Sequence, residues 1–162
     1  IMPIIENSFN GKLLPFFFLA SAGLLLLGQY FSNKKQQHEM TFKDALIIGI
    51  AQGFATFPGL SRSGTTISAG LISGSNREEV AKFSFLMSIP IILLSMALEI
   101  YKIIVLGEVI SINWIGLILA FFTAFIVGVV SIKAMIKLTQ KAGFKGFCLY
   151  LILIAIISIF VI

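Results

Sequence analysis

The chain has 162 residues, of which 58% are hydrophobic and only 12% are charged. Soluble domains carry about twice that share of charge, so the composition excludes an ordinary water-soluble domain and indicates an integral membrane protein. The net charge of +5 bears, in such a chain, on topology and lipid contact rather than on nucleic acid.

The first predicted element is a transmembrane helix over 13–33. It contains no charged residue and, at 1.5 Å per residue, can cross a hydrocarbon core about 30 Å thick. The polar loop that follows contains the single histidine, His38, whose place among other polar residues favours a solvated position over a ligand role. Thr41 and Asp44 then form a Thr-x-x-Asp start signal for the next helix.

The second apolar region, 42–75, is interrupted at its centre. Its halves, 45–57 and 62–74, would each be about 20 Å long as helices, which is too short to cross the core. Pro58 and Gly59 stop the first half, and Ser61 can cap the second. The region is therefore either one kinked span or a re-entrant hairpin of two half-helices.

Three more transmembrane helices are predicted, over 77–104, 112–135 and 146–162, the first with a kink at Pro90. Ser75 and Asn76 supply the start signal of the first, each three residues before a glutamate. Lysines recur every fourth residue from the end of the second helix onward, which is typical of an anchor at an anionic lipid surface; they are Lys133, Lys137, Lys141 and Lys145. The single cysteine, Cys148, lies in an apolar run and is expected to be a buried structural thiol.

The distribution of basic residues separates the two alternatives for 42–75. A re-entrant hairpin places nine basic loop residues on one side and two on the other, whereas a spanning segment divides them four to seven. The positive-inside rule favours the larger bias, with the basic loops in the cytoplasm. The sequence therefore predicts an all-α membrane protein with about four transmembrane helices and one re-entrant helical hairpin.

Arg62 is the only charged residue between Asp44 and Arg77. A guanidinium at the centre of a bilayer costs about 2.5–3.5 kcal/mol even on the mildest scale, so a compensating partner is expected. Arg62 lies where the second half-helix begins, and unpaired amides at a helix N-terminus favour an anion. We therefore predict a phosphate site formed by Arg62 with the hydroxyls of Ser61, Ser63, Thr65 and Thr66, close backbone approach at Gly59 and Gly64, and an amide contact from Gln52.

Helix packing is the competing explanation for such residues, because Gly, Ser and Thr are common where membrane helices approach closely. It is preferred for Ser84 and Ser88, and it is about even with the site for Gln52. No metal ligands are predicted near Arg62, since the nearest carboxylates, on Asp44 and Glu78, belong to the outer ends of the hairpin. A phosphate site of this kind also fits a transporter of phosphate or of a lipid phosphate, because broken helices form anion sites in transporters.

The run Pro58-Gly59-Leu60-Ser61-Arg62-Ser63-Gly64-Thr65-Thr66 resembles the signature of the bacterial undecaprenyl-pyrophosphate phosphatases, or bacitracin-resistance proteins. The resemblance extends to 48–52, Arg77-Glu78-Glu79 and 82–90. It implies hydrolysis of undecaprenyl pyrophosphate in the bacterial plasma membrane, dependence on Mg²⁺ or Ca²⁺, and a fold of two inverted halves with one re-entrant hairpin each. It also implies pyrophosphate-binding or catalytic roles for Ser61, Arg62, Ser63 and Thr66.

The chain departs from this family in one respect. The family's first half carries paired glutamates and a Ser-Thr-Gly-His run, and neither occurs here. The resemblance then covers the last helix of the first half and the whole second half. We expect the chain alone not to be a competent phosphatase, and to depend on a separate first half or on a second copy in the opposite orientation, which the charge bias disfavours.

Overall fold

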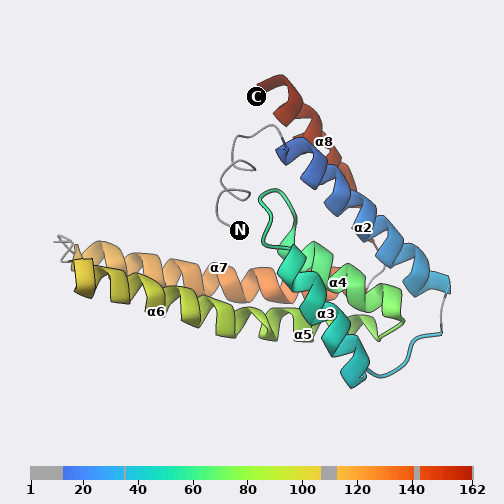
Figure 1. Cartoon of the computed structure of the whole chain (residues 1–162), viewed down its shortest axis with the longest axis horizontal. Coiled ribbons are helices and arrows are strands. Elements are labelled where there is room, and N and C mark those ends of the chain that lie inside the picture. Colours follow the sequence, from blue (N-terminus) through green and yellow to red (C-terminus); the bar gives the residue numbers. More distant parts are fainter. Residues whose placement is uncertain (1–12, 35, 107–112, 141–142, 162) are drawn as a thin grey trace.

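The computed structural model describes residues 13–34, 36–106, 113–140 and 143–161, and these fold into helices joined by short connections (Figure 1). The described residues contain no β-strand beyond an isolated bridge between His38 and Ser75. This confirms the all-α class. The helices are α2 (Leu14–Lys34), α3 (Phe42–Phe54), α4 (Arg62–Ser73), α5 (Arg77–Leu86), α6 (Ser88–Leu106), α7 (Trp114–Gln140) and α8 (Lys145–Val161).

Three helical segments are long and apolar enough to cross a membrane: α2, the stretch Arg77–Val105 formed by α5 and α6, and α7. The fourth predicted transmembrane helix corresponds to α8, a shorter apolar helix of 17 residues. The chain is thus built as a multi-pass membrane protein.

The interrupted region forms two helices, α3 and α4, that fold back on one another (Figure 1). Their outer ends are joined by backbone hydrogen bonds. The amide of His38 donates to the carbonyl of Gly74 at 3.1 Å, and the amide of Asn76 donates to the carbonyl of His38 at 2.9 Å. The chain therefore enters α3 and leaves α4 at the same end of the pair, which is a hairpin rather than one kinked helix.

The predicted start signals lie at the helix ends. Thr41 and Asp44 form a capping box at α3, and the Ser61 hydroxyl caps α4 by accepting from the amide of Gly64 at 3.2 Å. Asn76 caps α5 through the amide of Glu78. Local hydrogen-bonding chemistry alone therefore located these three boundaries.

The break predicted at Pro90 occurs earlier, at Met87, between α5 and α6. A proline lacks the amide that would bond the carbonyl four residues before it, and its ring crowds that carbonyl. For Pro90 that residue is Leu86, where α5 ends. The disturbance is thus one turn N-terminal to the proline.

Helix α7 continues to Gln140, beyond the predicted end at 135, and so includes Lys133 and Lys137. Lys145 instead begins α8, and Lys141 lies outside the described residues. Lys133 and Lys137 therefore share α7, whereas Lys145 belongs to a different helix.

The buried core lies where α2 packs against α4 and α8. It includes Leu25, Ile67, Leu71 and Cys148, whose thiol is 3.6 Å from the carbonyl of Ala22. This confirms the buried cysteine. By contrast, α6 and most of α7 extend to one side of this core (Figure 1). Their apolar side chains are mostly exposed, as expected of surfaces that face lipid.

Polar contacts bind the outer end of the hairpin. Asp44 is 4% exposed and accepts from the amide and hydroxyl of Thr41 at 2.9 and 2.6 Å, and His38 Nδ1 lies 3.8 Å from its carboxylate. Burial acts to raise the pKa of Asp44, but hydrogen bonds from Thr41, Ser73 and Ser75 outweigh it and lower the pKa from 3.8 to about 2.

We predict that Asp44 makes stability depend on pH in acid. A carboxyl with a folded-state pKa below its unfolded value stabilises the fold above the unfolded value, and this contribution is lost as pH falls from about 4 toward 2. Thermal unfolding in detergent should show a falling midpoint across that window, and Asp44→Asn should flatten the dependence. A dependence unchanged in Asp44→Asn would contradict the assignment.

Candidate functional site

The connection between α3 and α4, residues 55–61, packs against α2. The hydroxyl of Ser21, which is fully buried, accepts from the amide of Ser61 at 2.8 Å and lies 2.9 Å from the carbonyl of Phe17. The rings of Phe17 and Phe57 stack with centroids 5.6 Å apart. Helix α2 therefore holds the tip of the hairpin in place. Sequence reasoning missed Ser21, because nothing in an apolar helix marks one serine among others.

The glycines of the tip have a packing role. Gly59 has a φ of 90°, and a Cβ there would lie 2.9 Å from Cβ of Phe17. A Cβ on Gly64 would lie 2.8 Å from the Ser61 hydroxyl. Both glycines therefore admit close approach of protein groups, and the approach of a ligand to them stays a prediction.

Arg62 is the first residue of α4 and is half-buried. Its Nη2 atom is buried and has no hydrogen-bond partner within the described ranges. Buried guanidinium nitrogens normally find an acceptor, because leaving a charged donor unsatisfied is costly. The geometry leaves this donor available for an anion at the N-terminus of α4, where the helix dipole also favours negative charge.

Arg62 and Ser63 line a cavity of about 220 Å³ together with Ser84, Phe85 and Ser88. The cavity thus combines one guanidinium with three serines. Ser88 donates to the carbonyl of Phe85 at 2.6 Å, so the expected packing role holds for its hydroxyl, but the sequence analysis did not place it or Ser84 beside Arg62. Their four-residue spacing, which puts both on one helical face, was the available signal.

The remaining predicted site residues do not line this cavity. Thr66 is 1% exposed, and its hydroxyl bonds the hydroxyl of Ser84 and the carbonyl of Arg62. Thr65 Oγ1 and Gln52 Oε1 are buried and have no partner in the part of the chain that is described. Ser61 uses its hydroxyl as the cap of α4. The structure therefore brings Arg62 and Ser63 to one surface and places Thr66 behind them.

No group of three or more His, Cys, Asp or Glu side chains that could hold a metal ion occurs among the described residues. Asp44 and Glu79 are at the outer end of the hairpin, where Glu79 accepts from the amide of Met40 at 2.7 Å. Glu78 pairs with Lys82 there. Because Mg²⁺ and Ca²⁺ need several oxygen ligands, the described residues alone do not fit the cation that the resemblance implies.

We predict that Ser21→Ala loosens the hairpin tip. The substitution leaves the Ser61 amide without its acceptor in a packed interface, which should lower the free energy of unfolding by about 1–3 kcal/mol. Thermal unfolding in detergent measures the loss, with Ser95→Ala on the exposed helix α6 as the matched control. Equal midpoints for the two variants would contradict the role of Ser21.

Comparisons with known proteins identify the family of the chain. A protein named undecaprenyl-diphosphatase from Thermosipho africanus is 45% identical over 158 residues, covering 97% of this chain and 60% of the relative. Proteins of the same name from Methanosphaera stadtmanae and Bacteroides fragilis are 40% and 39% identical, with 96% and 94% of this chain covered. The chain spans 55% and 58% of those two, so it matches a little over half of the length of these relatives. The profile of the bacitracin resistance protein BacA matches residues 2–157, which is nearly the whole chain, and the chain therefore belongs to the BacA family of bacitracin resistance proteins.

Proposed function

We propose that this chain binds the diphosphate of undecaprenyl pyrophosphate and takes part in its hydrolysis to undecaprenyl phosphate and phosphate in the bacterial plasma membrane. The observation that carries the proposal is the buried, unpartnered Nη2 of Arg62 beside a cavity with three serines. The names of the relatives support the substrate, and the apolar helices support a lipid environment.

The proposal places α3 and α4 in the membrane as a re-entrant hairpin. The two helices have 13 and 12 residues and so reach about 20 Å, less than the thickness of the hydrocarbon core. Their outer ends are joined by hydrogen bonds, and Lys43 and Arg77 lie beside those ends, at the starts of α3 and α5. This supports a hairpin that enters from the cytoplasm and returns to it, with Arg62 at its inner tip.

The chemistry assigned to the chain is anion binding and charge stabilisation. The guanidinium of Arg62 is planar and can donate to two phosphate oxygens at once. The positive end of α4 and the hydroxyl of Ser63 add donors at the same point. Donors fixed before the reaction stabilise the charge that develops during phosphoryl transfer.

A divalent cation, which the family resemblance implies, would need carboxylate ligands, and none of the described residues that line the Arg62 cavity is an Asp or Glu. It forms no part of the role proposed for this chain. In the same way, the attacking group is not assigned to any described residue. The proposal is limited to what Arg62, Ser63 and the start of α4 can do.

Transport of phosphate or of a lipid phosphate is the second candidate. It is favoured by the pair of short helices whose tip presents an anion site, since secondary transporters bind anions in this way. Carboxylates facing Arg62 in an assembled site would favour hydrolysis, because they could hold a cation against the phosphates.

Phosphate release from undecaprenyl pyrophosphate in detergent tests the proposal. The chain is assayed alone and joined to the part of the Thermosipho africanus relative that it does not cover, with and without Mg²⁺ or Ca²⁺. We expect cation-dependent release from the joined form and none from the chain alone. Release from the chain alone would show that the described site is sufficient for hydrolysis. No release from either form would favour transport over hydrolysis.

A further inference from the structure

A second cavity adjoins the Arg62 cavity. Its volume is about 420 Å³, and it shares Ser63 and Phe85 with the smaller one. A volume of this size falls within the range of small-ligand sites in proteins, about 300–1,000 Å³. The two cavities therefore lie side by side, and Arg62 lines the smaller one.

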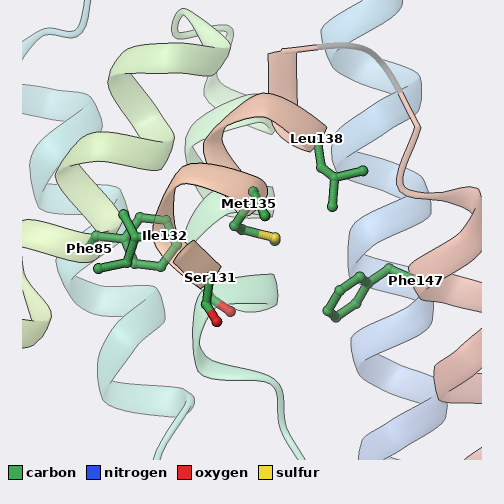
Figure 2. A pocket seen from close by; sticks show the side chains of 8 residues that line it. Phe85, Ser131, Ile132, Met135, Leu138 and Phe147 are labelled. Atoms are coloured by element: carbon green, nitrogen blue, oxygen red, sulfur yellow. The ribbon is translucent and has the colours of Figure 1, made fainter. Parts of the chain in front are cut away.

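The second cavity is lined mainly by apolar side chains, unlike the Arg62 cavity. Six of its eight residues are apolar and two are serines; the full set is Ser63, Phe85, Ser131, Ile132, Ala134, Met135, Leu138 and Phe147. Figure 2 shows Phe147 of α8 directed toward α7, which contributes Met135 and Leu138, with Phe85 on the far side. Among the described residues, no polar side chain other than the two serines lines this cavity, so it suits a hydrocarbon chain.

We propose that this cavity holds the first isoprene units of a prenyl pyrophosphate whose diphosphate lies at Arg62. This inference rests on the proposed function and adds the place and the residues that receive the tail. A ligand with an anion at one end and an apolar chain at the other matches the lining of both cavities. Because the volume admits a few isoprene units and not a whole undecaprenyl tail, the rest of the tail extends beyond the cavity into the lipid.

Protection of an introduced cysteine tests binding without requiring activity. In a Cys148→Ala background, Leu138→Cys places a thiol on the cavity wall, and Leu119→Cys places one on the same helix outside it; the two leucines are 49% and 63% exposed. Undecaprenyl pyrophosphate should slow maleimide modification of Leu138→Cys about tenfold at a concentration about ten times its Kd. Modification of Leu119→Cys should be unchanged, and inorganic pyrophosphate should protect neither site.

The variants separate this inference from the proposed function. Adding Arg62→Ala should remove most of the protection if the diphosphate is the anchor. If undecaprenol protects as well as the pyrophosphate, and Arg62→Ala has no effect, the result supports an apolar tail site and contradicts the role of Arg62 in binding the diphosphate. If phosphate release by the joined form depends on Arg62 but Leu138→Cys is never protected, the tail site fails and the proposed function stands.

A space-filling substitution adds a second measurement. Ala134→Phe puts a ring into the cavity, whereas Ala124→Phe puts the same ring on an exposed part of α7. In the joined form, Ala134→Phe should raise KM for undecaprenyl pyrophosphate about tenfold, as expected when several buried methylene contacts are lost, with kcat nearly unchanged. The KM for isopentenyl pyrophosphate should change little, because its single unit stays close to Arg62. Equal KM values for the two phenylalanine variants would overturn the proposal.

Discussion

Arg62→Ala should reduce phosphate release by the joined protein by about 10³-fold. Removing one donor to a developing oxyanion costs about 10²–10³ in rate, and removing an arginine that stabilises a transferred phosphoryl group costs about 10³–10⁵. The structure supports a value in this range, since Nη2 of Arg62 is buried and has no acceptor in the described part of the chain. The assay is initial-rate phosphate release at saturating substrate.

Arg62→Lys separates charge from geometry. Lysine keeps the positive charge but loses the planar fork, so we expect an intermediate rate, nearer to that of alanine than to that of arginine. Arg77→Lys is the matched control, because Arg77 lies at the outer end of the hairpin, where its Nε donates to Ser32 at 2.8 Å. A control that loses as much activity as Arg62→Lys would show that general destabilisation explains the effect.

Gly59→Ala should lower the free energy of unfolding by about 2–4 kcal/mol. A φ of 90° is unfavourable for alanine, and its Cβ would lie 2.9 Å from Cβ of Phe17, inside normal contact. The expected loss of stability is the sum of two terms: the backbone strain at residue 59 and the energy of displacing α2 from the hairpin tip. Thermal unfolding in detergent measures stability, and binding of undecaprenyl pyrophosphate reports whether the tip keeps its shape.

Gly53→Ala is the matched control for this variant. Gly53 lies in α3, and nothing is within 4 Å of a Cβ built there. Alanine in a helix is favoured over glycine by about 1 kcal/mol, so this variant should unfold at the same temperature or higher. If both glycine variants lose stability equally, the close contact between Gly59 and α2 is not the cause.

The sequence predicted the fold class and much of the helix order because the signals for these are local. Charge-free runs mark α2 and α7, and caps such as Thr41 and Ser61 depend on atoms within three residues. The break was predicted at Pro90 and lies one turn earlier, at Met87, because a proline disturbs the carbonyl four residues before it. The end of α7 was predicted at 135, five residues early, because Lys137 was taken to follow the helix, although lysine is a good helix former.

The candidate site could be predicted only in part. Arg62 stands out because its charge is isolated in apolar sequence, and Ser63 is its neighbour. Ser21 and Ser84 are brought to the site by packing between helices that are distant along the chain, and a single sequence contains no signal for such contacts. The apolar cavity is likewise formed by residues of four helices, so hydropathy alone could not separate its lining from surfaces that face lipid.

The bonds between His38, Gly74 and Asn76 have a geometric consequence for the whole hairpin. With this end at the cytoplasmic surface, as proposed, the depth of Arg62 equals the length of α4, which is about 18 Å for 12 residues. The length of α4 thus sets how far below the membrane surface the guanidinium, and a diphosphate bound to it, would lie. Inserting one residue into α4 would move the guanidinium about 1.5 Å deeper and turn it by about 100° around the helix axis, so length and direction cannot be changed independently.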